Sequence, residues 1–352
     1  MLTEASKKLM RLGGGRSTVA LRDWTIADFW TREQELRQPS YSLEPASSLV
    51  NDHAKPNAPA DGSMRSLTKI GDNMTTIIDC RPPIGTPDLK AIKAKQQVAW
   101  SSGDYAIVGV TIQIVGERLA EAMDLRSGQK VLDVAAGNGN FTLAAARRWC
   151  DVTSTDYVDN LLQRGCQRAE AEGFPVTFQK ADAEDLPFTD ASFDAVASTF
   201  GGMFSPDQGR TASEMLRVCR SGGRIGLANW TPDGFIGQMF KTIGKHLPPP
   251  AGVKSPALWG TLEWIEKTFR AEASSLVAEP RYFVFRYRSA QHFVDVFRQY
   301  YGPMLKAFEA LDATGREVLT QDIIELIGRL NRSGDGTMVV PSEYLEVVVT
   351  RR

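Results

Sequence analysis

The sequence lacks an excess of either charge. Its 352 residues include 41 basic and 42 acidic side chains, which gives a formal net charge of -1. Proteins that bind nucleic acid or anionic membranes through charge usually carry a basic excess or a long basic run, and this sequence has neither. We therefore expect a protein that acts on a small molecule and has no nucleic-acid partner.

Cysteines and long apolar runs are also scarce. The four cysteines, Cys80, Cys150, Cys166 and Cys219, have no metal-type spacing, so we expect reduced thiols and no metal site. No uninterrupted apolar run approaches the ~20 residues that span a bilayer, and the N-terminal residues lack a signal-peptide core. These absences predict a cytoplasmic protein without a membrane span.

Residues 1–73 are poor in apolar side chains and rich in Pro, Ser, Asn and Asp. Such a composition buries too little apolar surface to offset the entropy of ordering the chain. We predict a disordered N-terminal extension over residues 1–73 and a folded domain over 74–352. No cofactor motif precedes Met74, so we expect the extension to be dispensable and Met74 to be a candidate natural start.

Helical periodicity comes before the first strand. A first helix is predicted over about 86–100, and a second begins at Ile107. The second helix is marked by one apolar stripe, made of Val108, Ile112, Val115, Leu119 and Met123. Gly128 follows as a stop signal, so we expect one continuous helix with this stripe in the core.

Strand and helix patterns then alternate. Apolar strand patterns occur at 130–135, 151–156, 176–182, 193–200 and 223–230, with helical stretches between them. Two further strands are predicted over 281–289 and 344–352. Strands that are apolar throughout are typical of a parallel sheet covered on both faces. The fold class is therefore α/β, a doubly wound, seven-stranded and mostly parallel sheet.

Two segments, about 231–280 and 289–333, interrupt this alternation, and we predict that they are helical cap insertions. They are rich in aromatic residues, namely Phe235, Phe240, Trp259, Trp264, Phe293, Phe297, Tyr300 and Tyr301. Ligands of open α/β sheets bind at the carboxyl ends of the strands, where such insertions emerge. The aromatic residues either line a pocket for an apolar or aromatic substrate or form a small satellite core.

The stretch "VLDVAAGNGNFTLAAARRWCDVTSTD", Val131–Asp156, is a strand, a glycine turn, a helix and a second strand that ends on an acid. A dinucleotide-binding fingerprint would need a third glycine where Thr142 stands. A site that needs only a tight turn for a carboxylate, and an acid for a ribose diol, is satisfied by this turn and Asp156.

From about Tyr105 to Trp230 the chain resembles the class I S-adenosylmethionine-dependent methyltransferases. The resemblance rests on "VLDVAAGNGN", Asp156 in "TSTDYV", "KADAEDLPF" and "FDAVASTFGGMF", in that order. It implies a Rossmann-like methyltransferase sheet, S-adenosylmethionine as the cofactor and methyl transfer as the activity. The chain is most similar to the ubiquinone and menaquinone C-methyltransferase-like group, which includes many small-molecule enzymes. It has "STFGG" where enzymes that methylate nucleic-acid bases usually carry a "PP" motif.

The resemblance also assigns roles to residues. It implies that the loop at 137–139 cradles the methionine part of the cofactor and that Asp133 anchors this loop and reaches the cofactor amine through water. Asp156 would accept both ribose hydroxyls, and Asp182 would accept the adenine amino group while the Ala183 backbone reads a ring nitrogen. The candidate cofactor-binding residues are Tyr105, Asp133, Ala135, Gly137, Asn138, Gly139, Asp156, Tyr157, Asp182, Ala183, Ser198 and Thr199.

Among these, Tyr157 would lie against the adenine, Ser198 and Thr199 would end the fourth strand under the sulfonium, and Tyr105 would be a lid contact. Methyl transfer from a sulfonium is an in-line displacement that needs alignment and exclusion of water more than acid–base groups. The candidate catalytic residues are His292 and Tyr301, each as a base.

Two other functions remain open from the sequence. One is an NAD(P)-dependent oxidoreductase, which Thr142 disfavours, and the other is a non-catalytic protein that binds the cofactor without transfer. A metal-assisted mechanism is not expected, because Phe200 and Trp230 stand where acids would be required. The sequence does not indicate an oligomeric state or the identity of the acceptor.

Overall fold

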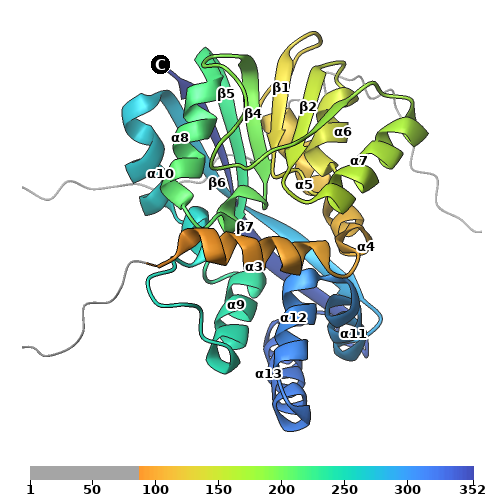
Figure 1. Ribbon diagram of the computed structural model, residues 1–352. Coiled ribbons are helices and arrows are strands. Elements are labelled where there is room, and N and C mark those ends of the chain that lie inside the picture. Colours follow the sequence, from red (N-terminus) through yellow and green to blue (C-terminus); the bar gives the residue numbers. More distant parts are fainter. Residues whose placement is uncertain (1–86) are drawn as a thin grey trace, which may run out of the picture. The chain divides into compact units, whose positions relative to one another are not determined.

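A seven-stranded sheet forms the centre of the computed structural model, which describes residues 87–352 (Figure 1). Its strands are ordered β3-β2-β1-β4-β5-β7-β6. β1 to β5 pair in parallel, and β7 runs antiparallel between β5 and β6. The strands are β1 (Lys130–Val134), β2 (Asp151–Asp156), β3 (Thr177–Lys180), β4 (Phe193–Thr199), β5 (Cys219–Trp230), β6 (Ala273–Tyr287) and β7 (Met338–Arg351). The predicted doubly wound, mostly parallel sheet is confirmed.

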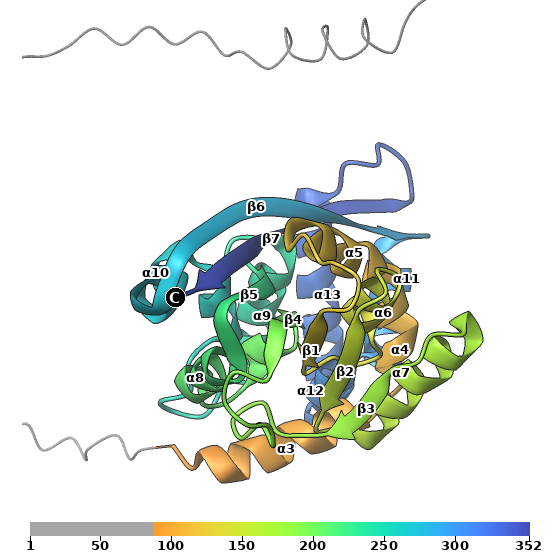
Figure 2. The same cartoon turned by 90° about the horizontal axis from the view of Figure 1, so that it is seen from above.

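Helices cover both faces of this sheet, as its apolar strands require. Leu132 of β1 is fully buried and stands in register with the equally buried Val196 of β4. Seen along the strands, α5, α6 and α7 lie on one side of the sheet, whereas α8 and α10 lie on the other (Figure 2). These helices are α5 (Gln113–Ala122), α6 (Asn140–Ala146), α7 (Asp159–Glu172), α8 (Gln208–Val218) and α10 (Leu262–Phe269).

The helix predicted from Ile107 is present but is interrupted once. The chain forms α4 (Tyr105–Gly109), a 3-10 turn at Val110–Ile112, and α5, which ends at Ala122 instead of near Gly128. One cause is tertiary, because the side chain of Asn140 donates a hydrogen bond of 2.7 Å to the Gly109 carbonyl at the break. The predicted stripe is nevertheless buried, from Val108 (3% exposed) to Met123 (0%).

A layer of helices lies beyond the carboxyl ends of the parallel strands (Figure 1). It consists of α3 (Leu89–Ser101), α9 (Phe235–His246), α11 (Ala290–Tyr300), α12 (Gly302–Ala310) and α13 (Ala313–Leu330). The helix predicted over about 86–100 corresponds to α3, which crosses directly below the strand ends in this view. Asp88 caps α3 by accepting a hydrogen bond of 3.0 Å from the Ala91 amide.

The predicted cap segments match this layer unevenly. Segment 289–333 contains α11 to α13 and belongs to it. Segment 231–280 contributes α9, but its later part forms α10, which lies beside α8, and then enters β6 at Ala273. The reason is that Trp259 and Phe269 are fully buried against the sheet and its helices, so this stretch packs onto the core instead of covering the strand ends.

The predictions for residues 1–73 and for Met74 lie outside the described residues. Within residues 87–352, no single helix has both the length and the apolar character needed to cross a membrane. The stretches Leu89–Ser101 and Tyr105–Ala122 satisfy these criteria only when taken together, and they are bent by 74° relative to each other.

Candidate functional site

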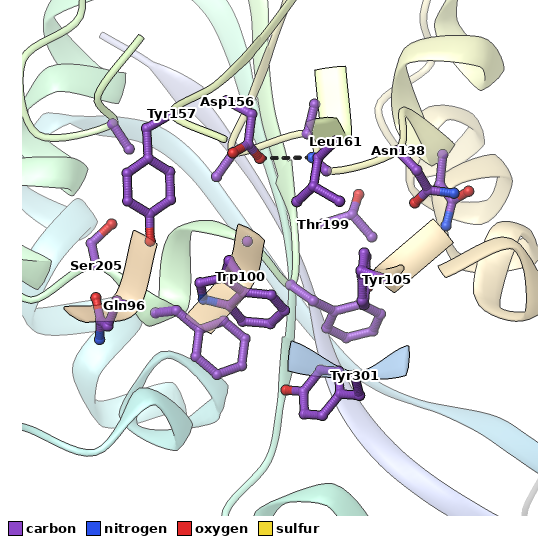
Figure 3. Close-up of a pocket in the computed structure, with 18 of the residues that line it drawn as sticks. Gln96, Trp100, Tyr105, Asn138, Asp156, Tyr157, Leu161, Thr199, Ser205 and Tyr301 are labelled. Atoms are coloured by element: carbon purple, nitrogen blue, oxygen red, sulfur yellow. Dashed lines mark hydrogen bonds between the residues drawn. The ribbon is translucent and has the colours of Figure 1, made fainter. Parts of the chain in front are cut away.

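A deep pocket lies between the carboxyl ends of the strands and the helical layer (Figure 3). It encloses about 1180 Å³, part of which is open to solvent. Ala135, Asp156, Thr199 and Trp230 line it from the ends of β1, β2, β4 and β5. Lys93, Gln96 and Trp100 line it from α3. The sheet therefore presents one wall and the helices the opposite wall.

The glycine turn after β1 forms part of the sheet wall. Gly137 and Gly139 adopt positive φ angles of 57° and 81°, which glycine tolerates best. Ala135 also has a positive φ, 52°, although it has a side chain. A Cβ on the facing Gly201 would stand 2.1 Å from the Ala135 carbonyl oxygen, so only glycine at position 201 leaves room for this turn.

Asp133 anchors this turn from behind, and it does not line the pocket. Its Oδ2 accepts hydrogen bonds from the Thr142 amide (2.9 Å) and hydroxyl (2.6 Å). Burial raises the pKa of Asp133 to about 7. The structure thus supports the anchoring role and does not place Asp133 where the cofactor amine was expected. In the sequence, Thr142 was notable only because it replaces the third glycine of a dinucleotide-binding fingerprint. In the structure it is the hydrogen-bond partner of Asp133.

Asp156 faces the pocket at the end of β2 (Figure 3). One carboxylate oxygen accepts the Gly137 amide at 2.9 Å and the other accepts the Val158 amide at 2.9 Å. Burial nevertheless raises the pKa of this carboxyl to about 6. A carboxylate can accept about four hydrogen bonds, so acceptor capacity remains for a ligand with hydroxyl donors.

Asp182 and Ala183 line the same end of the pocket, together with Tyr157. The sequence did not point to their neighbour Lys93, whose ammonium group lies 2.6 Å from Asp182 and 2.5 Å from Glu184. These acids raise the pKa of Lys93 while its burial opposes them. Lys93 could not be found from the sequence because it is 89 residues away from Asp182.

Ser198 and Thr199, which are neighbours at the end of β4, differ in whether they line the pocket. The Ser198 hydroxyl donates to the Val134 carbonyl (2.7 Å) and accepts from the Gly202 amide (2.9 Å), so Ser198 ties two strand ends together and does not line the pocket. Thr199 lines the pocket, and its buried hydroxyl has no hydrogen-bond partner among the described residues. Successive residues of a strand point to opposite faces, which explains the difference.

Aromatic rings meet where α3, α4 and α12 converge on the pocket. Trp100 lies 5.6 Å from Tyr105 and 5.4 Å from Tyr301, measured between ring centroids. Both predicted residues, Tyr105 and Tyr301, therefore line the pocket, and Trp100 joins them (Figure 3). Burial raises the pKa values of both tyrosines, so each hydroxyl stays protonated near neutral pH. Tyr301 is thus placed to donate a hydrogen bond but is a poor base.

The placement of His292 does not support its predicted catalytic role. His292 is half-buried in the first turn of α11 and does not line the pocket. Its Nδ1 accepts a hydrogen bond of 3.3 Å from the Arg288 amide, and its ring lies 5.6 Å from that of Tyr287. The apolar side of α11, which includes Phe293 and Phe297, is buried. His292 lies on a different side of the same helix.

The predicted cap aromatics divide between pocket and core. Phe297 and Tyr301 line the pocket. Trp259 and Trp264 instead stack on each other at 4.3 Å, and Phe293 is completely buried. Other rings, which were not predicted to line the pocket, complete its wall. They are Trp100, Phe200, Phe204, Trp230 and Phe285.

Comparison with known proteins is consistent with this geometry. A family model described as a methyltransferase domain matches residues 131–223, which include the glycine turn and Asp156. The demethylmenaquinone methyltransferase of Deinococcus radiodurans is 31% identical over 182 residues, which cover 49% of this chain and 75% of that protein. The chain belongs to the class I S-adenosylmethionine-dependent methyltransferases.

Two uncharacterised proteins of Mycobacterium tuberculosis are more similar over a longer stretch. One is 37% identical over 240 residues, covering 67% of this chain and 88% of that protein. The other is 35% identical over 268 residues, covering 75% of this chain and 96% of that protein.

Proposed function

We propose that this methyltransferase transfers the methyl group of S-adenosylmethionine to a small acceptor that is largely apolar or aromatic. The observation that carries the proposal is the separation of charge along the pocket. The charged residues of its described wall are Lys93, Asp156, Asp182 and Glu184. The remainder of the wall is mainly aromatic and aliphatic, with Trp100, Phe200, Phe204, Trp230, Ile236, Met239, Phe285, Phe297 and Tyr301. An acceptor buried there must itself be mostly apolar.

The charged end suits the cofactor. Asp156 has acceptor capacity for the ribose hydroxyls, and Asp182 with the Ala183 backbone would hold the adenine beside Tyr157. The turn at 137–139 would hold the methionine part, which carries a carboxylate. Gly137 and Asn138 of this turn line the pocket.

S-adenosylmethionine, when bound, supplies a methyl group on a positively charged sulfur that is open to in-line displacement. The chain aligns the two reactants and excludes water, because the aromatic side chains contact one another around the acceptor end. Thr199 and Tyr105 line the wall next to the glycine turn, where the methionine part would lie. Tyr301 would orient a polar group of the acceptor by donating a hydrogen bond.

The similarity to demethylmenaquinone methyltransferase supports an acceptor of this class. That enzyme acts, by its name, on demethylmenaquinone, and a related compound is one candidate acceptor here. The proposal does not depend on this compound, since it follows from the character of the pocket wall.

The test uses Tyr301→Ala with Tyr300→Ala as its control, because the neighbouring Tyr300 does not line the pocket. Methyl-labelled S-adenosylmethionine is incubated with a metabolite extract, and the labelled products are partitioned into an organic solvent. We expect organic-soluble product, and a rate at least about tenfold lower for Tyr301→Ala with little change in cofactor affinity. Label confined to water-soluble products, or equal rates for the two variants, would contradict the proposed acceptor class.

A further inference from the structure

Arg168 lies behind the glycine turn and takes no part in the pocket wall. From α7, its Nη1 donates to the Asn138 carbonyl at 2.6 Å and to Oδ1 of Asn140 at 2.9 Å, while Nη2 donates to Oε1 of Gln113 at 3.0 Å. Burial lowers the pKa of this guanidinium, although Glu172 opposes the effect. Its direct partners among residues 87–352 are thus neutral oxygens and not a carboxylate.

Asn138 connects this cation to the pocket. The residue is 1% exposed, lines the pocket, and has a side-chain Nδ2 without a partner among the described residues (Figure 3). Its Oδ1 is packed against α4, since a Cβ on Gly109 would stand 2.4 Å from it. The amide therefore cannot turn freely. The Asn138 backbone carries the connection to the pocket, because it belongs to the glycine turn that lines the wall and its carbonyl accepts a hydrogen bond from Arg168.

We propose that Arg168 is a positioning residue that makes the site selective for a cofactor carrying a carboxylate on its methionine part. The guanidinium fork fixes the Asn138 carbonyl and Oδ1 of Asn140, and this holds the backbone of the glycine turn against which the carboxylate would lie. The positive charge behind the turn further favours an anion in front of it. This inference rests on the proposed cofactor site, and it adds a residue that does not line the pocket but holds the turn that does.

The test compares two nucleosides that share the adenine and ribose groups. S-adenosylhomocysteine has the amino-acid carboxylate, whereas 5′-methylthioadenosine lacks the whole amino-acid part. Calorimetry on the full chain gives the dissociation constants of both nucleosides. A variant that weakens both equally leaves the ratio of these constants unchanged. We expect Arg168→Met to weaken S-adenosylhomocysteine about tenfold and 5′-methylthioadenosine less than about twofold. Arg168→Lys should fall between, because it keeps the charge but not the fork.

Arg164→Met is the matched control. Arg164 lies on the same helix, is half exposed at its side chain (50%), and pairs with Asp104 at the surface, so its loss should leave the ratio unchanged. Asn138→Asp is a second variant that replaces the donor by an acid of the same shape. It should weaken S-adenosylhomocysteine far more than 5′-methylthioadenosine, because the added negative charge repels the carboxylate, and Arg168→Lys carries the test if Arg168→Met does not fold.

An unchanged ratio in folded Arg168→Met, or in folded Arg168→Lys when Arg168→Met is unfolded, would overturn the inference while leaving the cofactor site intact. A wild-type chain that binds neither nucleoside would overturn the proposed cofactor site, and the inference with it. These two failures are therefore distinct.

Discussion

At the residue scale, Asp156 connects the turn after β1 with the end of β2. It accepts one amide from each side, Gly137 and Val158, and is only 5% exposed. The two amides orient the carboxylate toward the pocket, while burial raises its pKa to about 6. Desolvation therefore outweighs the backbone hydrogen bonds, and a ligand that donates further hydrogen bonds would favour the ionised form.

We predict that S-adenosylhomocysteine binds more tightly as the pH rises from about 5 to about 7. Hydroxyl donors prefer the carboxylate, so binding lowers the pKa of Asp156 and releases a proton as the pH passes through about 6. Calorimetry in buffers of different ionisation enthalpy measures both affinity and proton release. Asp156→Asn should bind with little pH dependence over this range, and a slope equal to that of the wild type would refute the assignment.

A second prediction concerns how much Asp156 contributes to the free energy of cofactor binding. A buried acid that accepts two hydroxyl groups is worth about 1.5–3 kcal/mol, so Asp156→Ala should weaken cofactor binding about tenfold to a hundredfold. Exposed Asp159, three residues further along, offers an Asp159→Ala control that removes an acid without touching the pocket wall. Equal affinities for wild type and folded Asp156→Ala would remove Asp156 from the ribose site.

At the scale of the elements, α3 joins the two ends of the pocket. Lys93 pairs with Asp182 and Glu184 at the charged end, and the Gln97 side chain donates to the Tyr157 carbonyl at 2.7 Å. Further along the same helix, Trp100 contacts the aromatic end. One helix therefore contributes to both ends of the pocket, and its bonds to Asp182 and Tyr157 reach residues far away in the sequence.

Lys93→Gln should weaken cofactor binding by about three- to tenfold, because Asp182 and Glu184 would face each other without the cation between them. Lys93→Arg should retain most of the affinity. Lys95→Gln, an exposed change on the same helix, is the control and should have no effect. The loss should shrink at high salt, since the pair is partly exposed. Identical affinities for Lys93→Gln and Lys95→Gln would assign α3 no part in cofactor binding.

At the scale of the whole molecule, buried carboxyl groups under the glycine turn set the pH dependence of stability. Burial raises the pKa of Asp133 to about 7 and that of Asp156 to about 6. A group whose pKa is raised in the folded state contributes most below its unfolded pKa, and this contribution is lost as the pH rises through the folded pKa. Asp194, whose pKa is lowered by Arg220, acts in the opposite sense and only at more acidic pH.

The free energy of unfolding should therefore fall between about pH 4 and 7, by up to about 1.4 kcal/mol per pH unit for each group. Asp133→Asn should flatten this slope in thermal unfolding of the ligand-free protein. Asp151→Asn, a change at an exposed acid of β2, should keep the wild-type slope. A slope that Asp133→Asn leaves unaltered would show that the Asp133 carboxyl is ionised throughout this range.

Much of the cofactor end could be predicted because its parts are close in the chain. Asp133, the turn at 137–139 and Asp156 all belong to one strand–helix–strand unit, whose residue types and spacing are dictated by local backbone geometry. Two residues of this region, Asp133 and Ser198, do not line the pocket. Their hydrogen bonds to Thr142 and to the Val134 carbonyl depend on how neighbouring elements pack, which the spacing of residues in the sequence does not show.

The sequence by itself determined the doubly wound sheet, the family and the glycine turn, since alternating apolar strands and helices and a glycine-rich turn are local patterns. Only the tertiary structure decided which side chains meet across the pocket. Lys93 reaches Asp182 over 89 residues, and Tyr301 enters the wall while His292, on the preceding helix, does not. Such choices depend on how α3, α11 and α12 pack over the strand ends, and amphipathic periodicity fixes which face of a helix is buried but not what that face contacts.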